Sequence, residues 1–112
     1  MKLTVYSFSF RDGGVPDDAD FVQDCRRMRN PHHDPELRPL DGRDARVQAF
    51  VRQDGKFKPM FDHAVEAATY GETVAFGCVG GRHRSVACAE LVAAELRVQG
   101  HHVEVQHRAL QD

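Results

Sequence analysis

Residues 73–100 read TVAFGCVGGRHRSVACAELVAAELRVQG and change character twice. The run 73–76 combines β-branched, small and aromatic residues, which is typical of a buried strand. From residue 85 on, apolar residues recur every three or four positions, which indicates an amphipathic helix; they are Val86, Ala89, Ala93 and Leu96. Gly100 stands where a glycine would end that helix. The segment therefore predicts a strand, a glycine-rich turn and a helix, in that order.

The turn at residues 80–85 has the composition of an anion-binding site. A helix N-terminus presents unpaired backbone N–H groups and a partial positive charge, and glycines let an anion approach the backbone. Two guanidiniums beside such a terminus suit the oxygens of a phosphate. The predicted ligand residues in the turn are Gly80, Gly81, Arg82, His83, Arg84 and Ser85. The alternative is a tight strand-to-helix turn with solvated arginines.

The same turn also allows an enzymatic interpretation, because Cys78 is followed after five residues by Arg84. This spacing resembles the loop of cysteine-dependent phosphatases, in which a thiolate attacks phosphorus while arginine and backbone amides hold the oxygens. That loop normally has a histidine before the cysteine, where this chain has Gly77. The alternative hypothesis is thus a phosphatase with Cys78 as nucleophile and Arg84 as phosphoryl ligand. Its general acid would be Asp34, Asp41 or His32. Neither the P-loop nucleotide motif nor the dinucleotide fingerprint is present.

The length of 112 residues suits one compact domain, which we assign to residues 1–112. The net charge of −2 gives no overall attraction to nucleic acid. Three cysteines, an odd number, make no closed disulfide framework, so we expect reduced thiols in a cytoplasmic protein. No apolar run suits a signal peptide or a membrane span, and we predict no membrane partner and no cofactor.

The rest of the chain supplies further strands and helices. Residues 2–10 are nearly all strand formers, so we expect a first strand that is buried on both faces. Shorter strands are predicted at 21–25 and 101–107, and helices at 44–51, capped by Asp44, and at 59–69. Strands linked by helices are usually parallel. The predicted fold class is α/β, a small, mostly parallel sheet of about four strands with helices packed on it. A phosphate-binding loop would join a strand to a helix N-terminus.

Two further groups of polar residues are expected near the turn. Ligands of open α/β sheets bind beyond the carboxyl ends of the strands, and there the pattern puts Ser7, Ser9, His107 and Arg108. The proline-rich segment 30–42, NPHHDPELRPLDG, is expected to be irregular. It would close over a ligand with Asn30, His32 and Arg38, unless it is only a stiff surface loop. Adjacent histidines at 32 and 33 point to opposite sides of an extended chain, so we predict no metal site.

A local basic cluster precedes the proline-rich segment. Arg26, Arg27 and Arg29 could contact the backbone phosphates of RNA, together with Lys56 and Lys58. The acidic balance of the whole chain argues against strong binding by a monomer, and a homo-oligomer that concentrates these patches is an open alternative.

Several blocks, taken in order, carry a family resemblance. They are SFSF at 7–10, DAD at 18–20, Asp24 with Arg26, NPH at 30–32, PELRPL at 35–40, Gly42, GC at 77–78, GGRHRSVA at 80–87 and HR at 107–108. In these blocks the chain resembles the C-terminal domain of the RapZ family of RNase adapter proteins, over essentially its whole length. The resemblance implies an α/β domain that binds glucosamine 6-phosphate and small RNAs.

This chain departs from the family pattern in its length and at three positions, and these departures affect the function that we expect. Full-length members carry an N-terminal P-loop kinase-like domain that this chain lacks, so we expect a stand-alone domain without nucleotide binding. Val79, His33 and Asp41 stand where threonine, tryptophan and threonine are usual. The leading hypothesis is a non-catalytic domain that binds a phosphorylated small molecule in a regulatory or RNA-adapter role.

Overall fold

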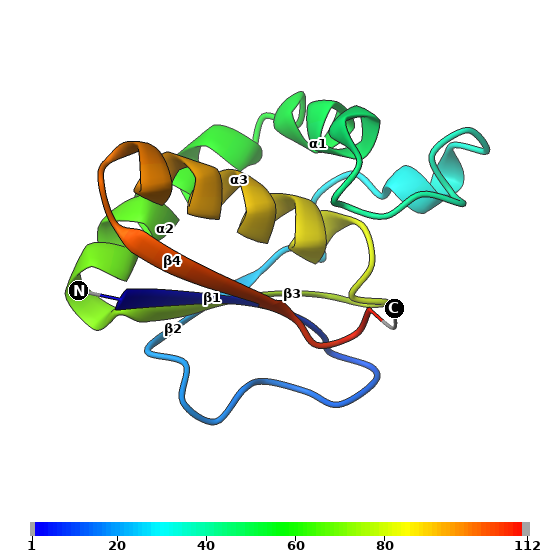
Figure 1. The fold of residues 1–112 in the computed structure, drawn as a ribbon. Helices are drawn as coiled ribbons and strands as arrows, with labels where there is room; N and C mark the ends of the chain where they lie inside the picture. The colour runs from blue at the N-terminus through cyan, green and yellow to red at the C-terminus, as the bar shows by residue number, and fades with distance from the viewer. Residues whose placement is uncertain (1, 111–112) are drawn as a thin grey trace.

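A four-stranded sheet with helices on one face forms the structure, a computed structural model that describes residues 2–110 (Figure 1). The strands are β1 (Lys2–Ser9), β2 (Phe21–Asp24), β3 (Thr73–Cys78) and β4 (His102–His107). The helices are α1 (Ala45–Arg52), α2 (Phe57–Gly71) and α3 (Arg84–Val98), with a short 3₁₀ turn, η1 (Pro31–His33), before α1. The predicted α/β class and the order strand, turn, helix at residues 73–100 are confirmed.

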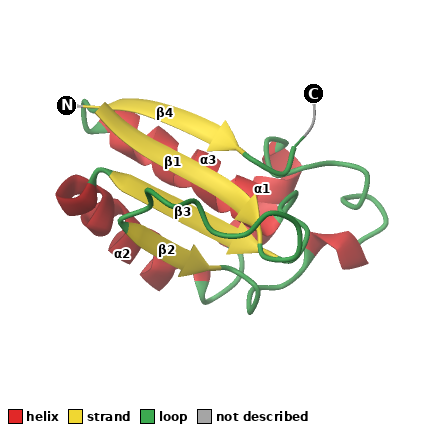
Figure 2. Ribbon diagram, turned by 90° about the horizontal axis from the view of Figure 1, so that it is seen from below, coloured by secondary structure: helices red, strands yellow, loops and turns green. Residues whose placement is uncertain are grey.

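All the strands run parallel in the order β2-β3-β1-β4. Val5 lies opposite Val74 of β3 on one side and Val105 of β4 on the other. The arrowheads of the four strands point the same way in Figure 2, so the carboxyl ends of the strands meet at one edge of the sheet. The predicted parallel sheet is therefore confirmed, and with it the edge at which a ligand is expected.

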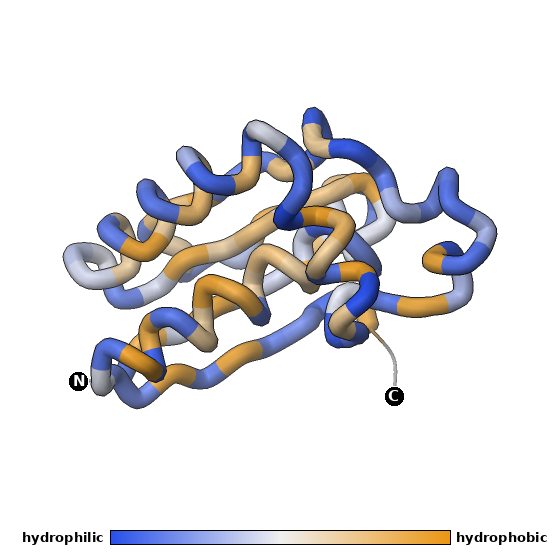
Figure 3. The backbone as a smooth tube through the Cα atoms, turned by 90° about the horizontal axis from the view of Figure 1, so that it is seen from above, coloured by the Kyte–Doolittle hydropathy of each residue, from blue (hydrophilic) through white to orange (hydrophobic). Residues whose placement is uncertain are grey.

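The core lies between the sheet and the helical layer, where α3 packs on β1, β3 and β4. Val5, Phe76 and Leu96 are completely buried there. Several positions of α3 are alanine, which lets the helix backbone approach the sheet closely. Hydrophobic and hydrophilic residues alternate along the helices in Figure 3, as the helical period requires.

No helix within residues 2–110 covers the opposite face of the sheet. The connection from β1 to β2 runs across this face instead (Figure 2). Thr4 and Tyr6 stay partly exposed, and the Tyr6 hydroxyl donates to Asp18 Oδ2 at 3.1 Å. Phe8 is buried near the end of β1, with its ring centroid 4.9 Å from that of Phe10. Our expectation of a strand buried on both faces is wrong for the first half of β1, because a loop covers less surface than a helix.

The ends of the helices follow local chemistry. Asp44 caps α1, because its side chain accepts from the Arg46 N–H at 2.8 Å. Helix α2 begins two residues before the predicted start and includes Gly71; Glu72 then takes the left-handed conformation, with φ of 74°. Gly100 follows α3 with φ of 95°, which confirms its predicted role. Of the helices within residues 2–110, none has the length and apolar character needed to cross a membrane.

Candidate functional site

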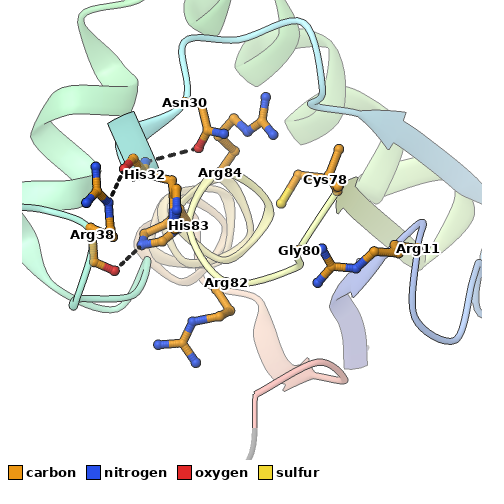
Figure 4. Close-up of a pocket in the computed structure, with 10 residues that line it drawn as sticks. Arg11, Asn30, His32, Arg38, Cys78, Gly80, Arg82, His83 and Arg84 are labelled. Atoms are coloured by element: carbon orange, nitrogen blue, oxygen red, sulfur yellow. Dashed lines mark hydrogen bonds between the residues drawn. The ribbon is translucent and has the colours of Figure 1, made fainter. Parts of the chain in front are cut away.

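A cavity of about 290 Å³ opens at the carboxyl edge of the sheet, and we call it the arginine cavity (Figure 4). Three segments form it: the β3–α3 turn, the proline-rich segment around η1 and the start of the β1–β2 connection. Its lining consists of Arg11, Asn30, His32, Arg38, Cys78, Val79, Gly80, Arg82, His83 and Arg84. Seven of the predicted ligand residues are thus brought together: Asn30, His32, Arg38, Gly80, Arg82, His83 and Arg84.

The lining is strongly cationic. Its described residues include four arginines and two histidines and no aspartate or glutamate. The first residue of the 15-residue helix α3 is Arg84, so the positive end of the helix dipole lies at the cavity as well. Arg11 is paired with the neighbouring Asp12 at 3.0 Å, but both side chains are largely exposed and such a pair is weak. The cavity therefore suits an anion.

Glycine shapes the turn from β3 to α3. Gly81 has φ of 70°, and a Cβ there would lie 2.6 Å from the Ala109 Cβ and 3.0 Å from the Ser9 Cβ. Gly81 is therefore required for packing and does not line the cavity. Gly80 is different, because a Cβ there would meet only an Arg11 guanidinium nitrogen, at 4.0 Å. It leaves backbone open to the cavity.

Ser85 faces Cys78 and lies outside the cavity lining. Its side chain is fully buried, and the Cys78 thiol donates to Ser85 Oγ at 3.2 Å. The Ser85 N–H in turn donates to Cys78 Sγ at 3.4 Å. The pair joins the end of β3 to the start of α3, and the ligand hydroxyl that we expected from Ser85 is engaged in the fold.

Arg84 has both a structural role and a place in the lining. It is 6% exposed, and its Nη1 donates to the carbonyls of Arg26 at 2.8 Å and Met28 at 3.1 Å. This holds the chain after β2 against α3. Among residues 2–110, Arg84 Nε finds no acceptor although it is buried. An unmet buried donor costs about 1–3 kcal/mol, so an acceptor from a ligand would be stabilising here.

His83 braces the proline-rich segment. Its Nε2 lies 3.2 Å from the Arg38 carbonyl oxygen, and because a carbonyl only accepts, this nitrogen carries the hydrogen. The Arg38 Nε donates to the His32 carbonyl at 2.7 Å, which closes the segment on itself. Burial lowers the pKa of His83, so the ring is neutral at neutral pH.

The residues predicted to frame the ligand lie outside the cavity lining. Ser9 Oγ donates to the Val79 carbonyl at 2.6 Å and accepts from the Asp12 N–H at 2.9 Å. It ties together the two loops that carry Arg11 and Gly80. Ser9 therefore positions the lining and does not contribute to it.

A second, partly buried network joins β1, β4 and α3. Ser7 Oγ lies 2.6 Å from His107 Nδ1, and His107 Nε2 lies 3.0 Å from Glu90 Oε2. The hydrogen bond from His107 lowers the pKa of Glu90. The Arg108 N–H donates to the Ser7 carbonyl at 2.9 Å while its side chain is exposed. Ser7, His107 and Arg108 thus link β1 to β4 and α3, and none of them lines the cavity.

Comparison with known protein families gives a match over nearly the whole chain. The sequence model of the family described as RapZ C-terminal domain matches residues 1–111.

The chain belongs to the RapZ C-terminal domain family.

Its curated relatives include a nucleotide-binding protein of Jannaschia sp. (strain CCS1), which is 46% identical over 96% of this chain and 37% of the relative. Similar proteins of Ruegeria sp. (strain TM1040) and Thermobifida fusca (strain YX) are 39% and 41% identical. Each of these two matches covers 98% of this chain, and 40% and 41% of the relative. The chain spans about two fifths of the length of the relatives it matches.

A second recess adjoins the arginine cavity in this RapZ C-terminal domain. It is an open groove of about 720 Å³, which we call the arginine groove, and Arg26, Arg29 and Arg84 are among its lining residues. Arg27, the third residue of the predicted basic cluster, lines neither recess. The predicted basic cluster is therefore divided: Arg26 and Arg29 line the arginine groove, and Arg27 does not.

The phosphatase hypothesis meets a steric obstacle in this RapZ C-terminal domain. A Cβ on Gly77 would lie 2.4 Å from Phe8 Cζ and 2.5 Å from Phe10 Cε2, so the histidine that precedes the cysteine in phosphatase loops has no room. Of the three candidate general acids, only His32 lines the cavity. The carboxylate of Asp41 is bound by Arg43 at 2.7 Å, and Asp34 lines the neighbouring groove.

Two signals in the sequence were missed. Arg11 lines the cavity and directly follows the first predicted strand, where ligands of parallel sheets bind. Glu90 is a half-buried carboxylate that directly follows the buried Ala89 on α3, and its partner is the half-buried His107. Within residues 2–110, groups of three His, Cys, Asp or Glu side chains that could hold a metal ion are absent.

Proposed function

We propose that this domain binds a phosphorylated small molecule, a sugar phosphate, in the arginine cavity without converting it. The observation that carries the proposal is the lining that residues 2–110 provide: four arginines, two histidines and no carboxylate, beside the N-terminus of α3. Charge-assisted hydrogen bonds from guanidinium to phosphate are among the strongest available to a protein. A sugar phosphate matches this lining better than a neutral sugar does.

The lining offers separate donors for the two ends of such a ligand. Arg82 is exposed, and its guanidinium has no protein partner among residues 2–110; in Figure 4 it extends away from Arg84. The Arg84 Nε supplies one donor for phosphoryl oxygens, and Arg82 would supply others once its side chain turns toward the cavity. Asn30 accepts the His32 N–H through Oδ1 at 3.1 Å, which leaves its amide NH₂ to donate to a sugar hydroxyl.

The family suggests both the first ligand and the role. Resemblance to the RapZ C-terminal domain implies glucosamine 6-phosphate, and binding without turnover suits a regulatory or RNA-adapter role. The relatives are named nucleotide-binding proteins. Because this chain spans only about two fifths of them, we assign nucleotide binding to the part of those relatives that this chain does not match.

Calorimetry with glucosamine 6-phosphate, glucosamine and inorganic phosphate tests the proposal. We expect glucosamine 6-phosphate to bind, and glucosamine to bind at least tenfold more weakly. Arg82→Gln should weaken glucosamine 6-phosphate by about tenfold, because one charge-assisted hydrogen bond contributes about 1.5–3 kcal/mol. Arg84 is less suitable for this test, since its removal would also free two backbone carbonyls.

The matched control is Arg52→Gln, which removes an exposed arginine that does not line the arginine cavity. Its affinity should equal that of the wild type. Equal affinities for glucosamine and its 6-phosphate, or an Arg82→Gln variant that binds like the wild type, would reject the proposal.

A further inference from the structure

The arginine cavity and the arginine groove share two side chains. Asn30 and Arg84 line both recesses. The groove continues from these shared residues toward Arg26, Arg29 and Phe50. A ligand held in the cavity would therefore need only a short extension to enter the groove.

The groove presents a guanidinium, that of Arg29, that forms no ion pair with a carboxylate within residues 2–110. Arg29 lies over the Phe50 ring, with its central carbon 4.7 Å from the ring centroid. The nearby Asp54 carboxylate accepts from the backbone N–H of Arg29 at 2.6 Å and not from its guanidinium. Arg26 is different, because it is bound by Asp24 at 2.7 Å while it lies over the Phe10 ring. Stacking on an aromatic ring fixes a guanidinium plane and leaves its edge free to donate.

Arg84 forms the wall between the recesses, and its charge is also unpaired. Arg84 is only 6% exposed, and among the described residues no carboxylate contacts it. Its Nη1 donates to two backbone carbonyls, and its Nε has no acceptor. A buried charge without a counter-ion is costly, so an anion in either recess would stabilise this side chain.

One carboxylate, that of Asp34, also lines the groove. Its Oδ1 accepts from the Glu36 N–H at 2.9 Å, so the carboxylate is held by its own turn. Arg29 and Arg84 remain as cationic groups without carboxylate partners. The balance of charge in the groove favours an anionic occupant.

We propose that the arginine groove binds a second anionic group of the same ligand, so that the domain prefers a sugar carrying two phosphoryl groups to a sugar monophosphate. The inference rests on the proposed function, because the arginine cavity holds the first phosphoryl group. Arg29 provides the preference, since it lines the groove and not the cavity.

Calorimetry with glucose 1,6-bisphosphate, glucose 6-phosphate and glucose 1-phosphate tests this preference on one sugar ring. The bisphosphate should bind at least tenfold more tightly than the tighter monophosphate, as expected for one added charge-assisted contact. Arg29→Gln should remove that advantage and change monophosphate affinity less than twofold. Its backbone N–H still donates to Asp54, so the fold is retained, which a thermal melt checks. Arg52→Gln should preserve the whole pattern.

The outcomes separate the two proposals. If glucosamine 6-phosphate binds but the bisphosphate has no advantage over the monophosphates, the groove proposal is overturned and the proposed function stands. Equal weakening of all the ligands by Arg29→Gln would also overturn it. If no sugar phosphate binds at all, both proposals fail.

Discussion

Gly77→Ala tests the packing that leaves no room at this position for the histidine of phosphatase loops. The new Cβ would lie 2.4 Å and 2.6 Å from two ring carbons of Phe8, and 2.5 Å from Cε2 of Phe10. Carbon atoms in contact prefer about 3.5–4.0 Å, so rings must move by about 1 Å. Phe8 is only 1% exposed and is enclosed by the sheet and the β1–β2 connection.

Overpacking of this kind costs about 1–3 kcal/mol in the free energy of unfolding. We expect that loss in urea denaturation followed by circular dichroism. The matched control is Gly55→Ala, because a Cβ there meets nothing within 4 Å, and it should change stability by less than about 0.5 kcal/mol. Combining Gly77→Ala with Phe10→Ala should cost less than the sum of the single changes, because the smaller residue makes room.

A Gly77→Ala variant as stable as the wild type would refute the reasoning. In that case the position could hold a larger residue, and the absence of the phosphatase histidine would carry no steric meaning. Additive effects of Gly77→Ala and Phe10→Ala would locate the cost away from the Phe10 ring.

Three further predictions concern charge and chemistry. The backbone N–H groups of Arg29, at 2.6 Å, and of Lys56 donate to the Asp54 carboxylate and lower its pKa. The stability that these hydrogen bonds contribute is therefore present above the unfolded pKa of about 3.9 and is lost as pH falls through the lower folded pKa. Asp54→Asn should reduce the difference between the unfolding free energies measured at pH 6 and pH 3. Burial lowers the pKa of His83, so the unfolded chain takes up a proton at a higher pH than the folded chain does. The free energy of unfolding should therefore fall as pH drops below about 6.5. His83→Gln should flatten this slope between pH 7 and pH 5, whereas the control His102→Gln, at an exposed position, should not. Cys78→Ser should leave glucosamine 6-phosphate affinity within about twofold, and release of phosphate from an aryl phosphate should stay at background in both proteins; steady release that the substitution abolishes would establish the enzymatic hypothesis.

RNA binding by this chain alone should be weak and insensitive to sequence. Arg26 is already paired with Asp24, and the net charge is −2. A filter-binding assay on single-stranded RNA should give a shallow salt dependence, since log affinity falls by about 0.7 per phosphate contact for each unit of log salt. Tight binding of one structured RNA at raised salt would contradict this expectation.

The fold follows from periodicity because its elements are locally consistent. The change from a strand pattern at 73–76 to a helical one after residue 85 matches β3 and α3, and the Asp44 cap and Gly100 mark real helix ends. The exposure of Tyr6 could not be predicted, because a strand of apolar and aromatic residues looks the same whether a helix or a loop covers its second face.

The candidate site follows from sequence only in part. Parallel strands bring the turn and the proline-rich segment to one edge, so Asn30 and Arg82 meet in one cavity as predicted. Sequence does not say where a donor points. Ser7 and His107 are at the predicted edge but hydrogen-bond to each other, and Arg84 directs Nη1 at backbone carbonyls. Such assignments depend on which buried polar groups need partners, and that is decided by the packing.

An assigned ¹⁵N–¹H correlation spectrum, titrated with glucosamine 6-phosphate and separately with glucosamine, tests most directly whether the arginine cavity is a phosphate site. We predict that the phosphorylated sugar shifts the amide signals of Asn30, Gly80, Arg82 and Arg84, the residues that enclose the cavity. The same concentration of glucosamine should leave these signals in place, and Val98 at the far end of α3 should be unmoved by either compound. Absence of shifts at Gly80 and Arg82, or the same shifts with glucosamine, would contradict the assignment of the arginine cavity as a phosphate site.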